Sequence, residues 1–121
     1  MHELVLIDDE ELIVASIKRI LRRSHTVTAF TSSSVALEHL LQRSEAPDLV
    51  LCDLSMPEIT GIELYDSVLL ENPALARSFA FMSGGGGLAQ ENVFLADKRE
   101  RYIQKPFNVN ELRDFVARTM T

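Results

Sequence analysis

Short apolar runs alternate five times with longer segments of helical spacing, and this alternation is the strongest constraint on the fold. The run Leu4–Ile7 is apolar throughout and is followed at once by acids, and Leu49, Val50, Leu51 and Cys52 repeat the pattern before Asp53. Short unbroken apolar runs of this kind are typical of buried strands, whereas apolar residues at every third or fourth position indicate helices. The predicted strands are Leu4–Ile7, Thr26–Phe30, Asp48–Asp53, Ser78–Met82 and Arg101–Ile103, and the predicted helices are Glu11–Arg23, Val35–Gln42, Ile62–Leu70, Leu88–Lys98 and Val109–Met120.

Strands joined by helices favour an α/β fold with a doubly wound (βα)5 arrangement. Parallel strands need right-handed crossover connections, which cover both faces of the sheet with helices. Local signals agree: Ser33 or Ser34 can cap the second helix, Asn108 with Glu111 fits a capping box before the last one, and Asn72-Pro73 is expected to stop the third. No linker, repeat or second domain is visible, so we expect residues 1–121 to form a single domain.

Composition and charge exclude several classes of protein. Hydrophobic residues make up 46% and charged residues 25% of the 121 positions, which is incompatible with a disordered chain. The single cysteine, Cys52, lies inside a predicted strand and is expected to be a core residue. A net charge of −6 disfavours direct nucleic-acid binding. No apolar run is long enough to span a membrane and the start of the chain lacks a basic signal-peptide region, so we expect a soluble, cytoplasmic protein.

Polar side chains follow four of the five predicted strands. In open α/β sheets the ligand crevice lies outside the carboxyl ends of the strands, so these residues are the candidates for chemistry. They are Asp8 and Asp9 after the first strand, Asp53 at the end of the third, Ser83 after the fourth, and Lys105 before Pro106 after the fifth.

These residues, in this order, resemble the receiver domain of two-component response regulators, and the resemblance covers essentially the whole chain. The matching segments are Asp8-Asp9, Asp53-Leu54-Ser55-Met56-Pro57, Gly61, Ser83-Gly84 and Lys105-Pro106-Phe107. The resemblance implies a flavodoxin-like, five-stranded parallel sheet of order 2-1-3-4-5. It also implies a single receiver domain over residues 1–121, acting as a signalling switch and not as a turnover enzyme.

In that strand order the first and third strands are neighbours, so Asp8, Asp9 and Asp53 should converge. Two like charges 4 Å apart repel by about 4 kcal/mol at an effective dielectric near 20, so three carboxylates either hold a proton or attract a cation. Oxygen ligands of this kind suit Mg²⁺. A simpler alternative is that the acids only cap helices, as Asp9 could do ahead of Glu11.

The resemblance also implies residue roles. Asp53 would accept a phosphoryl group from the phosphohistidine of a sensor histidine kinase or a histidine phosphotransfer domain. Asp9, Asp53 and the backbone carbonyl of Ser55 would ligate Mg²⁺ directly, Asp8 would act through water, and Lys105 would neutralise phosphoryl charge. The Lys105-Pro106 bond would be cis.

The same resemblance implies a switch. Ser83 would contact the phosphoryl group and Tyr102 would respond, which would alter the surface formed by helix 88–98, strand 101–103 and helix 109–120. That surface would serve a possible output domain or a homodimer. Tyr102 could equally be an ordinary half-buried strand aromatic.

Three alternatives from the residues stay open at this stage. The chain could be a docking module that works without phosphorylation, although Asp53 and Lys105 argue against it. A flavodoxin-like electron carrier would need a phosphate-binding loop where Asp8, Asp9 and Glu10 stand. A haloacid-dehalogenase-type phosphatase would need an acid at Ser55.

Two segments depart from the receiver pattern. Gly84-Gly85-Gly86-Gly87 follows Ser83, and this run predicts a mobile loop. The stretch Asp97–Arg101 lacks the small residues common before the last strand. Within Val93-Phe94-Leu95, one of three adjacent apolar side chains must face solvent or a partner, because they span about 200° of a helix at about 100° per residue.

Overall fold

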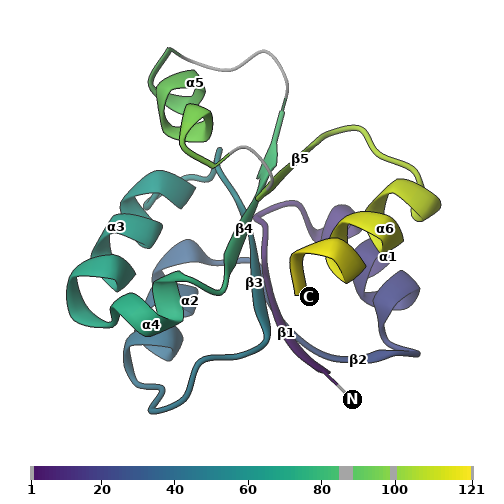
Figure 1. The fold of residues 1–121 in the computed structure, drawn as a ribbon, viewed down its shortest axis with the longest axis horizontal. Helices are drawn as coiled ribbons and strands as arrows, with labels where there is room; N and C mark the ends of the chain where they lie inside the picture. The colour runs from purple at the N-terminus through teal and green to yellow at the C-terminus, as the bar shows by residue number, and fades with distance from the viewer. Residues whose placement is uncertain (1, 85–88, 99–100, 121) are drawn as a thin grey trace.

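Five parallel strands form one sheet in a computed structural model that describes residues 2–84, 89–98 and 101–120. The strands are β1 (His2–Ile7), β2 (His25–Phe30), β3 (Leu49–Asp53), β4 (Phe79–Ser83) and β5 (Tyr102–Gln104). Their order is β2-β1-β3-β4-β5, as Figure 1 shows. The predicted fold class and strand order are therefore confirmed.

The helices are α1 (Glu11–Leu21), α2 (Ser33–Leu41), α3 (Gly61–Glu71), α4 (Pro73–Ala76), α5 (Ala89–Ala96) and α6 (Val109–Met120). Figure 1 places α1 and α6 on one face of the sheet and α2, α3 and α5 on the other. The predicted helices 88–98 and 109–120 correspond to α5 and α6.

The short helix α4 was not predicted. Asn72 does end α3, as expected, but its side-chain oxygen also accepts a hydrogen bond from the Leu75 amide at 3.2 Å. Pro73 occupies the first position of the new turn, where a missing N–H costs nothing. Asn72-Pro73 therefore ends α3 and also begins the one-turn helix α4.

The local capping signals had mixed outcomes. Ser32, and not Ser33 or Ser34, caps α2 by accepting from the Val35 amide at 3.3 Å, because the Ser33 hydroxyl donates instead to the Pro57 carbonyl at 2.9 Å. The capping box before α6 is confirmed by two reciprocal hydrogen bonds of 3.0 and 2.8 Å between Asn108 and Glu111.

The unbroken apolar strands are explained by two cores, one on each face of the sheet. Successive strand side chains point to opposite faces. Val5, Ile7, Val50 and Cys52 therefore pack under α2 and α3 in one core. The other core, with α1 and α6, contains Leu4, Leu6, Leu49 and Leu51. Cys52 is fully buried as predicted, and burial raises the pKa of its thiol.

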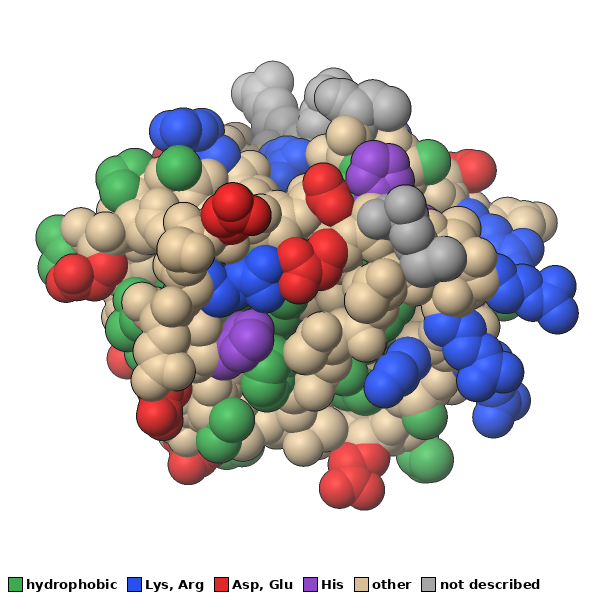
Figure 2. All heavy atoms as spheres, turned by 90° about the horizontal axis from the view of Figure 1, so that it is seen from below, with side chains coloured by type: hydrophobic (Ala, Val, Ile, Leu, Met, Phe, Trp, Pro, Cys, Tyr) green, Lys and Arg blue, Asp and Glu red, His purple; other side chains and the backbone are tan. Residues whose placement is uncertain are grey.

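Exposed cations gather away from the carboxyl ends of the strands. Figure 2 views the molecule from the end at which β1 begins, and Lys and Arg side chains cluster along one side of that face. The exposed Lys18 and Arg19 in the last turn of α1, followed by Arg22 and Arg23, complement the negative end of the helix dipole. No described helix combines the length and the apolar character needed to cross a membrane.

Gly61, at the start of α3, lets this helix approach the end of β3 closely. The Gly61 amide donates to the Leu54 carbonyl at 2.9 Å, and a Cβ placed on Gly61 would lie 2.3 Å from the Asp53 carbonyl oxygen. A side chain at this position would therefore push the helix away from the strand that carries Asp53.

We expect Gly61→Ala to lower the unfolding free energy by about 1–3 kcal/mol, because the added methyl meets backbone atoms that cannot move aside. Gly84→Ala is the matched control, since a Cβ there meets no atom within 4 Å. Urea denaturation followed by circular dichroism measures both. Equal stability of the two variants would contradict the close approach at Gly61.

Candidate functional site

Three aspartates converge at the carboxyl edge of the sheet. Ile7 pairs with Cys52 in the β1–β3 register, so the chain delivers Asp8 and Asp53 side by side. Oxygens of Asp8, Asp9 and Asp53 all lie within 4.8 Å of one another. Asp8 is fully buried and Asp53 is 3% exposed, whereas Asp9 is partly exposed. The acids predicted to meet do meet.

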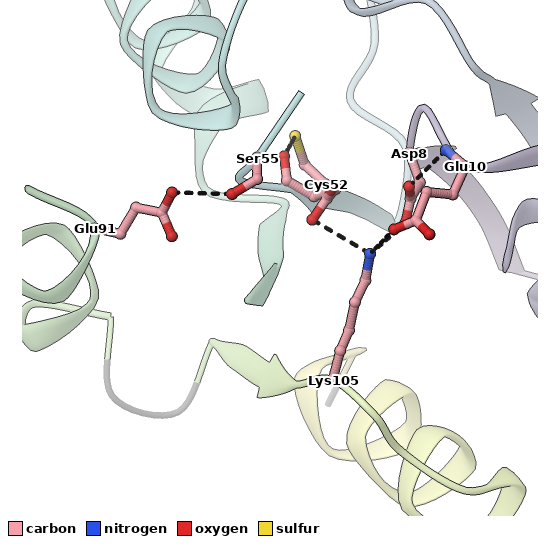
Figure 3. Close-up of polar contacts among 7 residues, drawn as sticks. Asp8, Glu10, Cys52, Ser55, Glu91 and Lys105 are labelled. Atoms are coloured by element: carbon pink, nitrogen blue, oxygen red, sulfur yellow. Dashed lines mark hydrogen bonds and ion pairs between the residues drawn. The ribbon is translucent and has the colours of Figure 1, made fainter. Parts of the chain in front are cut away.

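Lys105 reaches these carboxylates from the far side of the crevice (Figure 3). Its Nζ donates to Asp8 Oδ2 at 2.8 Å and lies 3.4 Å from Asp53 Oδ1. The Lys105 amide donates to the Ser83 carbonyl at 2.7 Å, which fixes the start of the side chain beside the end of β4. The Lys105-Pro106 bond is cis, as the resemblance implied.

Glu10 is a further member of the site that sequence reasoning did not single out. Its Oε1 lies 3.4 Å from Lys105 Nζ, and its amide donates to Asp8 Oδ1 at 2.9 Å. The signal available in the sequence was its position directly after two acids. Glu10 also occupies the N-cap position of α1 without a side-chain capping bond, so capping by Asp9 does not explain these acids.

The described residues of the site carry more acidic than basic groups. Burial, and then the charge of Asp8, raise the pKa of Asp53 to about 7, although Lys105 acts in the opposite direction. Burial opposes the charged form of Lys105, but its hydrogen bond to Asp8 and the charges of Asp53, Asp8 and Glu10 raise its pKa overall. Among the described residues of the site, one ammonium group contacts three carboxyl groups and a fourth, that of Asp9, lies beside two of them, so the arrangement attracts a further cation.

Comparison with known proteins places this geometry in a family. The response regulator receiver domain matches residues 4–117, which is nearly the whole chain. The chain belongs to the response regulator receiver domain family. It is thus part of the proteins of two-component signalling, and the open alternatives of an electron carrier and a phosphatase are set aside.

Individual relatives are distant in sequence and close in fold. A chemotaxis protein CheY homolog of Campylobacter jejuni is 27% identical over 113 residues, which cover 93% of this chain and 87% of that protein. The non-phosphorylated HemR receiver domain from Leptospira biflexa superimposes with a TM-score of 0.82 at 26% identity, covering 100% of this chain and 95% of that one.

Other relatives carry the receiver as a small part of a much longer protein. Sensor kinase CckA of Brucella abortus is 28% identical over 109 residues, which cover 89% of this chain and 11% of that protein. For Histidine kinase P4 of Formosa agariphila, 24% identical over 110 residues, the corresponding shares are 91% and 8%.

The two predicted switch residues of this receiver domain lie on adjacent strands. Ser83 ends β4 and is 5% exposed, and its partner in the β4–β5 register is Gln104. Tyr102 pairs with Phe81 and is partly buried against the core that also contains Leu95 of α5. The switching role of both residues stays a prediction.

The first turn of α5 brings a residue to the site that sequence reasoning missed. Glu91 is only 6% exposed, and its Oε2 accepts a hydrogen bond from Ser55 Oγ at 3.0 Å (Figure 3). In the sequence Glu91 has the pattern of an ordinary solvent-facing acid near a helix start, so no signal distinguished it.

The apolar triplet Val93-Phe94-Leu95 and the glycine run have different outcomes. The prediction that one of Val93, Phe94 and Leu95 faces solvent is confirmed, because Val93 is 72% exposed while Leu95 is buried. The predicted mobility of the glycine run falls on residues 85–87, which lie outside the described residues; Gly84 is exposed.

The raised pKa of Asp53 predicts how stability depends on pH. The folded protein holds a proton on this group up to about pH 7, whereas the unfolded chain releases it near 3.8. The unfolding free energy should therefore fall as pH rises between these values, by up to about 4 kcal/mol at about 1.4 kcal/mol per pH unit.

We expect Asp53→Asn to be more stable than the unmodified sequence at pH 8 without divalent cations, and this advantage to shrink toward pH 5. Lys105 keeps its bond to Asp8 in the variant. Asp66→Asn, at an exposed position of α3, is the matched control and should show no pH-dependent difference. Thermal melts between pH 5 and 8 measure this. An advantage of Asp53→Asn that does not change with pH would contradict the buried, protonated carboxyl.

Proposed function

We propose that this receiver domain is a phosphoacceptor in a two-component phosphorelay, with Asp53 as the acceptor. The observation that carries the proposal is the position of the Asp53 carboxylate, which is buried beside Asp8 and Asp9 with Lys105 Nζ at 3.4 Å. A carboxylate oxygen of Asp53 attacks the phosphorus of a phosphohistidine, the phosphorus–nitrogen bond breaks, and the imidazole leaves with the bonding electron pair. The product is an acyl phosphate on Asp53.

Lys105 supports this transfer in two ways. Its ammonium group favours the ionised form of Asp53, which is the nucleophilic form. The long side chain crosses the crevice from β5, so the same charge can neutralise phosphoryl oxygens as they arrive. Asp8 holds the ammonium in this place through the 2.8 Å hydrogen bond.

The residues present fit a magnesium ion. Three carboxylates with oxygens within 4.8 Å supply the hard ligands that Mg²⁺ prefers, and the excess of negative charge favours a divalent cation. We assign Asp9, Asp53 and the Ser55 backbone carbonyl as direct ligands, with Asp8 acting through water. When bound, the ion would supply positive charge to phosphoryl oxygens.

The phosphodonor is proposed to be a sensor histidine kinase or a histidine phosphotransfer domain. Leu12 lies in the first turn of α1, three residues after Asp9, and is 84% exposed, so an apolar side chain is available close to the site. Ile13, Phe107 and Val109 line a hollow next to Lys105 and extend this apolar surface. A helical partner that packs there would present its phosphohistidine to the crevice.

The output of the domain is proposed to pass through α5, β5 and α6. The Ser83 hydroxyl would contact a phosphoryl oxygen and Tyr102 would turn inward in response. The surface so altered would bind an output domain or a second copy of the chain. Activity, output and partners of any longer protein that contains this domain are proposals of the same kind.

The phosphoacceptor role predicts a mass change. Incubation with acetyl phosphate and Mg²⁺ should add one phosphoryl mass, and Asp53→Asn should abolish the addition because the asparagine amide does not replace the carboxylate nucleophile at position 53. Asp66→Asn, exposed on α3, should be labelled like the unmodified sequence. Intact-protein mass spectrometry reads both outcomes. Full labelling of Asp53→Asn would exclude the acceptor assignment, and no labelling of any variant would favour a docking module that works without phosphorylation.

The metal assignment predicts stabilisation by Mg²⁺. An ion that binds only the folded state raises the melting temperature by mass action, and one hundred times Kd corresponds to about 2.7 kcal/mol. Asp9→Ala should remove the response, whereas Asp66→Ala should retain it. Differential scanning calorimetry with and without MgCl₂ is the measurement. An unchanged response in Asp9→Ala would place the ion elsewhere.

A further inference from the structure

The first turn of α5 is tied to the phosphorylation loop by one buried polar contact. Ser55 lies two residues after Asp53, in the loop between β3 and α3, and its hydroxyl donates to Glu91 Oε2 at 3.0 Å. Glu91 is 6% exposed. Figure 3 shows the Glu91 side chain extending from α5 toward Ser55, with Lys105 on the other side of the view.

Among the described side chains, the other attachments of α5 are apolar or aromatic and lie further along the helix. Phe94 makes edge contacts with Tyr65 and Phe81, at ring centroid distances of 5.6 and 5.0 Å. Leu95 is buried in the same core, and Lys98 Nζ lies 4.7 Å above the Phe94 ring. These contacts hold the second half of α5, and of the side chains described in its first turn it is Glu91 that contacts the loop after Asp53.

This contact places a buried negative charge beside a loop that is to gain negative charge. Lys105, the described cation that contacts Asp53, is already engaged with Asp8 and Glu10 as well. Burial reduces solvent screening, so like charges repel more strongly here than at a surface. The Ser55 hydroxyl, which donates to Glu91, could instead donate to phosphoryl oxygens, which are strong acceptors.

We propose that Glu91 is a positioning residue that holds the first turn of α5 against the β3–α3 loop, and that a phosphoryl group on Asp53 opens the Ser55–Glu91 contact. This inference rests on the proposed function. The Ser55–Glu91 contact would couple the site to α5 through the loop after Asp53. This coupling is separate from the one proposed through Ser83 and Tyr102. By linkage, a partner that binds α5 with the contact open favours the phosphorylated state by the same factor.

Amide hydrogen exchange over residues 92–96 tests the contact and its opening. In the unmodified sequence, phosphorylation by acetyl phosphate and Mg²⁺ should speed exchange about tenfold, which is the size expected for loss of one hydrogen bond to a charged group. Ser55→Ala keeps the backbone carbonyl but lacks the donor, so exchange should already be fast without phosphodonor. Glu91→Gln keeps an acceptor oxygen without the charge, so exchange should stay slow in both states.

Asp97→Asn is the matched control, because it removes an exposed carboxylate just after α5 and should behave as the unmodified sequence. Slow exchange in unphosphorylated Ser55→Ala would overturn the positioning role of Glu91. Acceleration in phosphorylated Glu91→Gln equal to that of the unmodified sequence would overturn opening by charge.

Failure of the proposed function gives a different result. In that case the mass of the unmodified sequence does not change with acetyl phosphate, which overturns the opening step as well. The comparison of Ser55→Ala with the unmodified sequence needs no phosphodonor, so it still decides whether the Ser55–Glu91 contact positions α5.

Discussion

Repulsion among the carboxylates at the end of β1 and β3 is the constraint on which the site depends. The fold brings Asp8, Asp9 and Asp53 within 4.8 Å, and two of them are almost fully buried. Lys105 offsets part of this repulsion with a 2.8 Å hydrogen bond to Asp8, and protonation of Asp53 near neutral pH offsets another part. The remaining imbalance favours a cation at the site, which is the basis of the proposed phosphoacceptor role.

The two hydrophobic cores hold these carboxylates close together in spite of their repulsion. The strands that carry the aspartates are buried on both faces, between one core under α2 and α3 and another under α1 and α6. Gly61 lets α3 start in contact with the Asp53 backbone, and the bond from the Lys105 amide to Ser83 fixes the other side of the crevice. The stability of the two cores therefore maintains a set of charges that would separate in an unfolded chain.

The helix α5 is held by different contacts along its length. Its second half packs through Phe94 and Leu95, whereas its first turn is tied through Glu91 to the loop after Asp53. Val93 on the same helix is 72% exposed. The helix that contacts the loop after Asp53 through Glu91 thus also has an exposed apolar side chain.

The sequence by itself determined the alternation of strands and helices, because unbroken apolar runs and helical spacing are local signals. It also predicted which acids and which lysine meet at the carboxyl edge of the sheet, since each follows a strand or ends one. The helix caps were predicted less well than the helices. Ser32 caps α2, whereas the Ser33 hydroxyl donates to the carbonyl of Pro57, which is 24 residues away. Only the tertiary structure decided the approach of Glu10 to Lys105, the raised pKa of Asp53, and the burial of Glu91 against Ser55. The contacts of Glu10 and Glu91 join residues that are 95 and 36 positions apart in the sequence, and the pKa of Asp53 depends on the exclusion of water. The local pattern of the chain predicts neither long-range contacts nor burial of this kind.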